Sequence, residues 1–539
     1  MKFLNSLLYQ VHRWVGIVFS VSMLFWLLTG IAIIYSTPTT QNRSQQLAHA
    51  ESLHIEANWL SLGQAWDASE EQRNALVAKL KSTGTNKNHG SKANQQANHN
   101  QVVGINNARL LRSGNEPLWL IEDTLGQRFA VSALNGSLQE TSVEQALIIA
   151  QNWFKSSETP ELIKTSHLET VENPIILRNQ DALRPFHRIA VGDEGIELLI
   201  SSRTGEVLHA STRTERAFYW AGNWLHTFKP LESIGLGHIR HDIQTWFGLF
   251  ATLTTLTGLI IGWLRWRPGF AGKPTYSQGR TQPYRDFWFK WHFWSGLIGG
   301  AFLLSWAVSG FLETNPGQMF SKTTASPEEL TRYVGSELPE TMRLWQPKSE
   351  IKVNNLDIVE LDWQHLANEA VLLAYGRNGQ RWPLTLEGVD THFSDESLSA
   401  AIQRLAGNSK ISHQQLLEEY DSYYYPRHHQ SLVEKPLPVL LVELDDKAGT
   451  RFYLDPQDGR LLTKLDQNRR LYRWLYLGLH HWEFGWLSYR PLWNVWILTW
   501  VAFGLALSST AVVIGFKRLK KTLAPKKRPV SKQSTASSL

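Results

Sequence analysis

Residues 12–30 read HRWVGIVFSVSMLFWLLTG, and residues 292–310 read HFWSGLIGGAFLLSWAVSG. Both stretches open with His, carry Trp two residues later and Gly four residues later, and close with a hydroxyl residue followed by Gly. Each is long and apolar enough to cross a bilayer, which takes about 20 residues. We therefore predict two membrane helices, each with a histidine near its start. An ionisable residue in a membrane helix is by default a hypothesis for a functional site.

The composition narrows the possible chemistry. The 539 residues include 24 Trp and no Cys, and the formal net charge is +6. The absence of Cys excludes disulfides, thiolate-bound iron–sulfur clusters, c-type haem attachment and a Cys nucleophile. Residues 517–532 contain eight Lys or Arg and no acid. This bias is typical of a cytoplasmic tail rather than of nucleic-acid binding.

Four stretches predict membrane helices, with long polar segments between the first and second and between the third and fourth. A cleavable secretory signal is the alternative for the first, but its apolar run is too long and no small-residue cleavage site follows. The linker after the second carries five Lys or Arg and no acid as far as Arg285. The positive-inside rule therefore places this linker and both termini in the cytoplasm. We expect a cytoplasmic start (1–10), helix 11–35, a first periplasmic domain (36–238), helix 239–264, a cytoplasmic loop (265–286), helix 287–312, a second periplasmic domain (313–490), helix 491–516 and a basic cytoplasmic tail (517–539).

The first polar segment carries local structural signals. Residues 141–154 have apolar positions at helical spacing, which predicts a helix. Residues 189–207 predict two strands, the second ending in a turn at Thr204-Gly205. Residues 81–102 are rich in Asn, Gln, Gly and Ser, and we expect this insert to be disordered.

The matches between the two halves extend beyond the helices and predict a tandem duplication. Gly126 corresponds to Gly379 (379 − 126 = 253) and His226 to His480 (480 − 226 = 254), whereas the histidine helices are offset by 280 (292 − 12). The two offsets differ by 26 residues (280 − 254). This is close to the length of the 81–102 insert, which the second half lacks. We expect a repeated unit of helix, outer domain, His-bearing segment and helix, whose two copies pack as a pseudo-two-fold four-helix bundle.

The histidines fall into two groups at opposite ends of the predicted helices. His12 and His292 lie near the cytoplasmic ends, and the second group precedes the second and fourth helices. Two imidazoles that face each other across a bundle are what a six-coordinate b-type haem requires, and without Cys the haem is held non-covalently. The sequence therefore predicts two b-type haems with two His ligands each. The alternative for any single histidine is a place at the lipid headgroups, which recurrence in both halves disfavours.

The outer ligands stay open at this point. By depth, one of His226 or His241 pairs with His480 or His481. His480 and His481 are adjacent and point about 100° apart on a helix, so we do not expect them to bind one iron together. Roles as interface residues or helix caps are the alternative for each of them.

Residues 423–429 read YYYPRHH. An aromatic run with Arg and two His is a candidate contact for an anionic or metal-chelate substrate. The alternative is a strand edge packed on the membrane surface. The candidate substrate residues are Tyr424, Arg427, His428 and His429.

Several motifs together resemble the PepSY-associated transmembrane family over nearly the whole chain. They are the H-R-W-x-G helix, the D-x-Y-Y-Y segment, the stretch 437–460 and R-W-L-Y-x-G-L-H-H at 473–481. The resemblance implies PepSY-like α+β outer domains, and the chain is similar to the FoxB-type di-haem ferrisiderophore reductases of that family. Some relatives carry a fused flavin domain that this sequence lacks, which implies quinol or a soluble cytoplasmic reductase as electron donor. The resemblance to this family also implies haem-ligand roles for His12, His292, His241 and His480 or His481.

Together these features predict a multi-pass protein of a bacterial inner membrane. We expect it to reduce a periplasmic ferric siderophore or other Fe(III) chelate for iron uptake, with no nucleic-acid partner. The first alternative is a non-redox module in which the PepSY domains bind or regulate a protein such as a protease. The second, a metal transporter, is disfavoured because the helices lack intramembrane Asp and Glu.

Overall fold

The computed structural model divides into two compact units. The helical unit comprises Met1–Ser36, Phe218–Met319 and Leu471–Leu539, and the sheet unit comprises Thr37–Ala217 and Phe320–Arg470. The structure describes residues 2–36, 40–82, 103–155, 163–177, 180–193, 195–335, 338–348, 351, 353, 357–366, 369–427, 430, 432–487 and 489–523.

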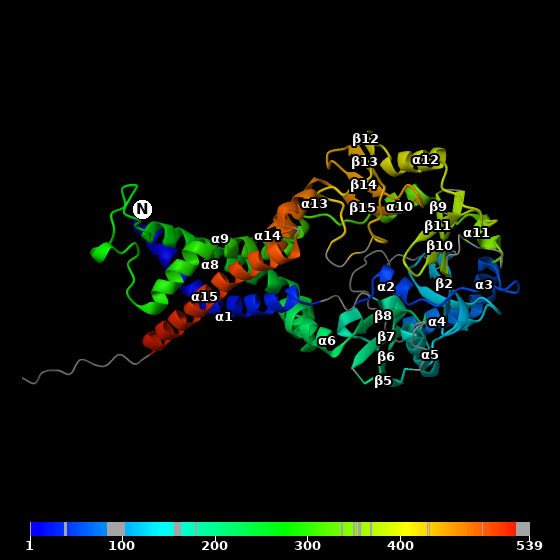
Figure 1. Ribbon diagram of the computed structural model, residues 1–539, viewed down its shortest axis with the longest axis horizontal. Helices are drawn as coiled ribbons and strands as arrows, with labels where there is room; N and C mark the ends of the chain where they lie inside the picture. The colour runs from blue at the N-terminus through cyan, green and yellow to red at the C-terminus, as the bar shows by residue number, and fades with distance from the viewer. Residues whose placement is uncertain are drawn as a thin grey trace, which may run out of the picture. The chain divides into compact units, whose positions relative to one another are not determined.

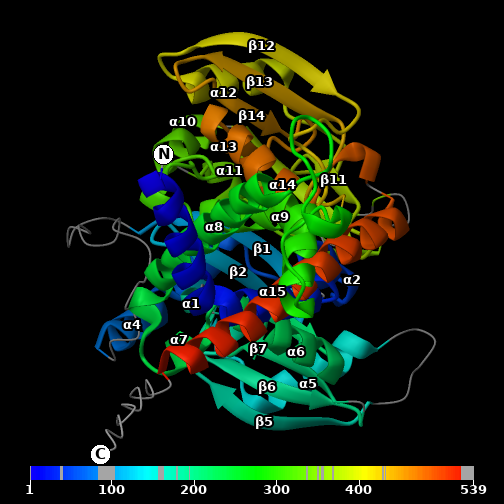
Figure 2. The same ribbon diagram turned by 90° about the vertical axis from the view of Figure 1, so that its left-hand side faces the viewer.

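Within its described residues, the helical unit contains four helices that are long and apolar enough to cross a membrane, as predicted. Helices α1 and α9 each pack against both α8 and α15, which closes a four-helix bundle (Figures 1 and 2). The first helix starts nine residues earlier than predicted (11 − 2), and the last continues into the basic tail because Lys and Arg are good helix formers. The four helices are α1 (Lys2–Ile34), α8 (Gly237–Arg265), α9 (Phe287–Glu313) and α15 (Arg490–Leu523).

Glycines let the membrane helices approach closely. A Cβ atom on Gly299 of α9 would lie 2.6 Å from the Cβ of Phe503 on α15. A Cβ on Gly248 of α8 would lie 2.9 Å from the Cα of Phe311 on α9. Small residues at helix contacts are the usual way in which membrane helices gain van der Waals packing. The bundle therefore has little tolerance for added side chains at these crossings.

Short segments lead into α8 and α15 in the same order. In each half a short helix runs into a π-helical turn, which is followed by a histidine (His226 or His480). The segments are α6 (Arg213–Tyr219), η4 (Trp220–Trp224) and α7 (Pro230–Ser233) before α8, and α13 (Gln467–Tyr472), η7 (Arg473–Gly478) and α14 (Leu479–His481) before α15.

The sheet unit holds three antiparallel sheets. Two have four strands each, in the orders β5-β6-β7-β8 and β12-β13-β14-β15, and the third has seven, in the order β11-β10-β9-β1-β2-β3-β4. The strands are β1 (Ile105–Ser113), β2 (Glu116–Asp123), β3 (Arg128–Ser132), β4 (Leu138–Gln139), β5 (Thr165–Val171), β6 (Phe186–Val191), β7 (Ile196–Ser201), β8 (Val207–Ser211), β9 (Ile358–Leu366), β10 (Glu369–Gly376), β11 (Arg381–Leu384), β12 (Lys410–Leu417), β13 (Val439–Asp445), β14 (Arg451–Leu454) and β15 (Leu461–Leu465).

The seven-stranded sheet joins the two polar segments of the sequence. Strand β1 pairs with β9, with Arg109 opposite Asp362, Leu110 opposite Leu361 and Leu111 opposite Glu360. Each segment also forms a four-stranded sheet of its own. The α+β character of both segments was predicted from the family resemblance, but the strand pairing between them was not.

Helices cover the sheets and close separate apolar cores. Helix α5 buries Ala146, Ile149, Ala150 and Trp153 against β6, β7 and β8. The core of the seven-stranded sheet includes Trp59, Trp119 and Trp363. The remaining helices of this unit are α2 (Arg43–Ala48), α3 (Leu62–Ala68), α4 (Glu70–Ser82), α5 (Val143–Phe154), α10 (Pro327–Val334), α11 (Glu340–Leu344) and α12 (Asp395–Ala406).

Several local predictions are confirmed. Helix α5 forms within 141–154, with Ser142 as its N-cap. Strands β6 and β7 cover the predicted strand region, and Gly205 takes a positive φ of 70° in the turn that follows. The insert 81–102 lies outside the described residues apart from Lys81 and Ser82, which end α4. The tandem duplication stays a prediction.

Candidate functional site

The rings of His12 and His292 face each other inside the helical bundle. His12 lies on α1 and His292 on α9, and their ring centroids are 6.3 Å apart with an interplanar angle of 43°. A metal–imidazole bond is about 2 Å long and a ring nitrogen lies about 1.1 Å from its centroid, so two imidazoles on opposite sides of one metal ion have centroids about 6 Å apart. The separation therefore suits one metal ion between the two rings.

Backbone carbonyls fix the orientation of both rings. The Nδ1 of His12 lies 3.1 Å from the carbonyl oxygen of Thr254, and the Nδ1 of His292 lies 3.3 Å from that of Leu507. A carbonyl oxygen only accepts, so each Nδ1 carries the hydrogen and each Nε2 keeps its lone pair. A metal-bound histidine usually donates its other ring N–H in this way.

Threonine hydroxyls support the same arrangement. The Oγ1 of Thr257 lies 3.4 Å from the Nδ1 of His12, and the Oγ1 of Thr510 lies 3.2 Å from the Nδ1 of His292. The two threonines donate their own hydroxyl hydrogens to carbonyls one turn earlier in α8 and α15. Their oxygens are therefore free to accept from Nδ1–H. Neither threonine was predicted from the sequence as a partner of a histidine.

Two further histidines, His226 and His480, have the same pattern of hydrogen bonds at Nδ1. The Nδ1 of His226 lies 3.0 Å from the Oγ1 of Thr29 on α1, and the Nδ1 of His480 lies 3.0 Å from the Oγ of Ser309 on α9. Each hydroxyl donates to a carbonyl of its own helix. Thr29 and Ser309 are the hydroxyl residues that close the two quoted stretches. In the sequence, the hydroxyl–Gly pair that ends each stretch indicated the repeat. In the structure, its hydroxyl residue is also the hydrogen-bond partner of a histidine.

Burial keeps the second pair neutral. It lowers the pKa of His226 to about 4. Burial, followed by the neighbouring His481 and His226, holds the pKa of His480 well below its usual range. Histidine must be neutral to bind a metal ion. Both rings are therefore in the binding form at neutral pH.

The family match extends over most of the chain. The sequence profile of the PepSY-associated TM region matches residues 9–400. The chain belongs to this family. The matched range includes His12, His226 and His292 and ends before His480. No curated protein matches the chain.

The four outer histidines of this PepSY-associated protein differ in their contacts. The side chain of His241 is 59% exposed, and its Nε2 lies 2.6 Å from the carbonyl oxygen of Thr314. That nitrogen therefore carries the hydrogen and donates it to Thr314. His481 packs its ring against His480 and Tyr476, at centroid distances of 5.4 and 5.2 Å. The hydroxyl partners at Thr29 and Ser309 thus single out His226 and His480 as the matched pair.

The YYYPRHH segment is only partly described. Tyr424 is fully buried, donates its hydroxyl to the carbonyl of Pro436 at 2.9 Å and stacks on Tyr453. It is a core residue, with no surface for a direct substrate contact. Arg427 is half-buried, and its backbone N–H donates to Gln430. His428 and His429 lie outside the described residues.

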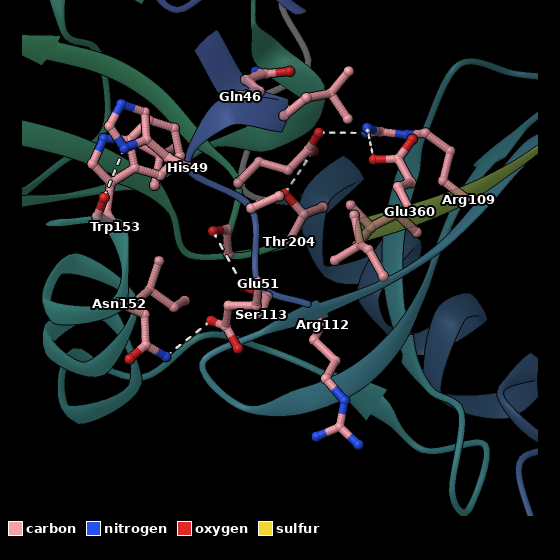
Figure 3. A pocket seen from close by; sticks show the side chains of 18 of the residues that line it. Gln46, His49, Glu51, Arg109, Arg112, Ser113, Asn152, Trp153, Thr204 and Glu360 are labelled. Carbon is pink, nitrogen blue, oxygen red and sulfur yellow. Dashed lines mark hydrogen bonds and ion pairs between the residues drawn. The ribbon is translucent and has the colours of Figure 1, made fainter. Parts of the chain in front are cut away.

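A buried ion-pair cluster in the sheet unit was also missed by the sequence analysis. Arg109 of β1 contacts Glu206 at 2.5 Å and Glu360 of β9 at 3.4 Å. Figure 3 shows Arg109 beside Glu360. Arg43 also pairs with Glu360. These residues border a cavity of about 80 Å³. Asp362 is buried next to them, and its Oδ1 has no hydrogen-bond partner among the described atoms. Burial, then the charge of Glu360, raises the pKa of Asp362 to about 6.

The cluster differs chemically from the histidine pairs. Its charges are balanced by one another, and they connect β1 of the first polar segment to β9 of the second. Within the described residues no group of three or more His, Asp or Glu is arranged to hold a metal ion. Two-histidine pairs suit an iron whose remaining ligands come with a macrocycle. The donor sets at both pairs are consistent with haem.

Proposed function

We propose that this protein is a transmembrane b-type haem oxidoreductase that reduces a ferric siderophore or another Fe(III) chelate. The observation that carries the proposal is the His12–His292 pair, with a centroid separation of 6.3 Å and both Nδ1 atoms on backbone carbonyls. The second pair has the same Nδ1 pattern with hydroxyl partners. The proposal assigns one haem to each pair.

Each residue has a defined part in this assignment. His12 and His292 would hold one haem, and His226 and His480 the other. A haem held there would supply one-electron transfer. The carbonyls of Thr254 and Leu507 orient the first pair, and the surrounding apolar helices exclude water. The protein thereby supplies neutral, fixed imidazoles.

The two pairs lie at different depths of the bundle. His12 and Thr29 are 17 residues apart on α1 (29 − 12), as are His292 and Ser309 on α9 (309 − 292). At a rise of about 1.5 Å per residue, this is about 25 Å along each helix. A bilayer core is about 30 Å thick. The pairs would divide this span into shorter electron transfers.

The positive charge of the α8–α9 loop supports a direction of transfer in this proposal. In a bacterial inner membrane this loop and both termini would face the cytoplasm. Electrons from quinol or a cytoplasmic reductase would enter at the His12–His292 pair. They would leave at the His226–His480 pair, where the periplasmic ferric chelate accepts one electron per iron and the resulting ferrous iron is bound less tightly.

Vesicles test this function directly. The purified protein is incorporated into vesicles that contain trapped dithionite, and an Fe(III) chelate with a chromogenic Fe(II) ligand is added outside. We expect Fe(II) to form at a rate that depends on the protein and is lost in His292→Ala vesicles. His241→Ala is the matched control and should retain the rate. Equal rates with all three proteins and with empty vesicles would contradict the proposal.

A further inference from the structure

An apolar groove runs along the outer surface of the helical unit between α8 and α9. It has a volume of about 610 Å³, and its walls include Leu259, Ile260, Trp263, Trp266, Trp294 and Ile298. Ile260, Trp263 and Ile298 are 41%, 59% and 47% exposed, so the groove opens away from the bundle interior. It covers the last two turns of α8 and the second and third turns of α9.

Small residues bring the two helices together beneath the groove. A Cβ atom on Gly300 of α9 would lie 2.8 Å from the Cδ2 of Leu259, and a Cβ on Gly262 of α8 would lie 3.6 Å from the Cδ1 of Leu297. The close approach makes a floor of aliphatic side chains, and indole rings form the walls. A surface of this composition, placed in the membrane span, favours a hydrocarbon chain.

A lysine of the α8–α9 loop adds charge at one end of the groove. The Nζ of Lys273 donates to the backbone carbonyl of Trp263 at 3.1 Å and lies 5.0 Å from the centroid of its ring. An ammonium group has three N–H donors, so two remain for another acceptor. No carboxylate among the described residues forms an ion pair with Lys273. The loop has no acid from Arg265 to Arg285.

We propose that the groove binds one anionic phospholipid, with an acyl chain between α8 and α9 and the phosphate at Lys273. Charge complementarity supports this occupant, because basic residues beside membrane helices attract anionic headgroups. A quinol is a poorer fit, since its oxidation releases protons and the groove walls carry no carboxylate or imidazole. The inference is independent of the proposed haem function.

Native mass spectrometry of the full-length protein in detergent tests this site. The delipidated protein is titrated with dioleoyl phosphatidylglycerol and, separately, with dioleoyl phosphatidylcholine. We expect one phosphatidylglycerol to bind in preference to phosphatidylcholine. Lys273→Gln should weaken phosphatidylglycerol binding about fivefold, because one basic residue near an anionic headgroup contributes on that scale. Lys520→Gln removes the same charge from an exposed position on α15 and should have no effect.

A second variant tests the acyl-chain contact. Ile298→Trp adds bulk to the groove wall and should reduce binding of both lipids, and Lys273→Gln keeps the test valid if the tryptophan variant does not fold. Equal binding of the two lipids, or equal effects of Lys273→Gln and Lys520→Gln, would overturn the proposal. Displacement of bound phosphatidylglycerol by inorganic phosphate alone would also overturn it, because the acyl chain would then have no part. Displacement by decylubiquinone at equimolar concentration would reassign the groove to a quinone.

Discussion

The Nδ1 atom of His480 lies 3.0 Å from the Oγ atom of Ser309. The same 3.0 Å separates His226 from Thr29 in the other half of the bundle. Because each hydroxyl hydrogen is donated to its own helix, each oxygen accepts from an imidazole N–H. The free Nε2 atoms are the basis of the proposed second haem site.

Removal of a histidine from the His12–His292 pair should remove one haem. We expect His12→Ala and His292→Ala each to lower the haem content of the purified protein by about half, measured as the pyridine haemochrome per chain. His241→Ala should leave it unchanged, because that side chain is exposed and bound to Thr314. Full haem content in both His12→Ala and His292→Ala would refute the assignment.

The hydroxyl partners should tune haem affinity. Ser309→Ala removes the acceptor at Nδ1 of His480 without removing the proposed ligand. We expect the affinity for haem to fall about tenfold, because the partners of metal-bound histidines contribute on that scale. Titration of haem into the apoprotein measures the change. Thr499→Ala removes an exposed hydroxyl that donates to Val495 of its own helix, and it is the control. Equal affinities for the two variants would exclude a positioning role for Ser309.

The fit of the His12 ring against α8 can be tested with two glycines. A Cβ on Gly258 would lie 2.8 Å from the Cε1 of His12, whereas a Cβ on Gly262 meets only Leu297, at an ordinary 3.6 Å. Gly258→Ala should therefore displace the ring and lower haem content by up to half. Gly262→Ala should retain full content. If the two variants bind haem equally, His12 is not held against α8 in the functional state.

Asp362 should make the sheet unit less stable as pH rises. Its pKa of about 6 exceeds the ordinary value of 3.8. The folded state therefore binds more protons between pH 4 and 6, and stability falls as pH rises through that range. Over this pH range the free energy of unfolding falls by on the order of 3 kcal/mol.

Hydrogen exchange at the β1 and β9 amides, corrected for intrinsic rates, measures this loss. Asp362→Asn should remove most of the pH dependence. Asp357→Asn, at a half-exposed ion pair with Arg377, should not. If the stability of Asp362→Asn depends on pH as steeply as that of the unchanged protein, another group is responsible for the titration.

The sequence was sufficient for the membrane helices and for bringing His12 and His292 together. Four long apolar runs leave few alternatives, and the recurrence of His12 at His292 marked the facing rings. It left the choice between His226 and His241 open because His226 lies shortly before the second helix and His241 lies in its first two turns. Only the backbone path through the π-helical turn before His226 decides which ring reaches Thr29.

The pairing of β1 with β9 was beyond sequence reasoning. The paired residues Arg109 and Asp362 are 253 positions apart (362 − 109), and alternating apolar strands of this kind pair equally well with many partners. The ion pair of Arg109 with Glu360 follows from that register, whereas Glu206 lies in the turn before β8. Neither glutamate stands in a recognisable motif.

The absorption spectrum of the detergent-purified protein, before and after reduction, tests the central claim most directly. The account predicts a sharp Soret band, narrow α and β bands on reduction, and two haems per chain. A featureless spectrum from protein produced with an ample supply of haem would contradict it. The four-helix bundle would then be the anchor of a binding module without redox activity.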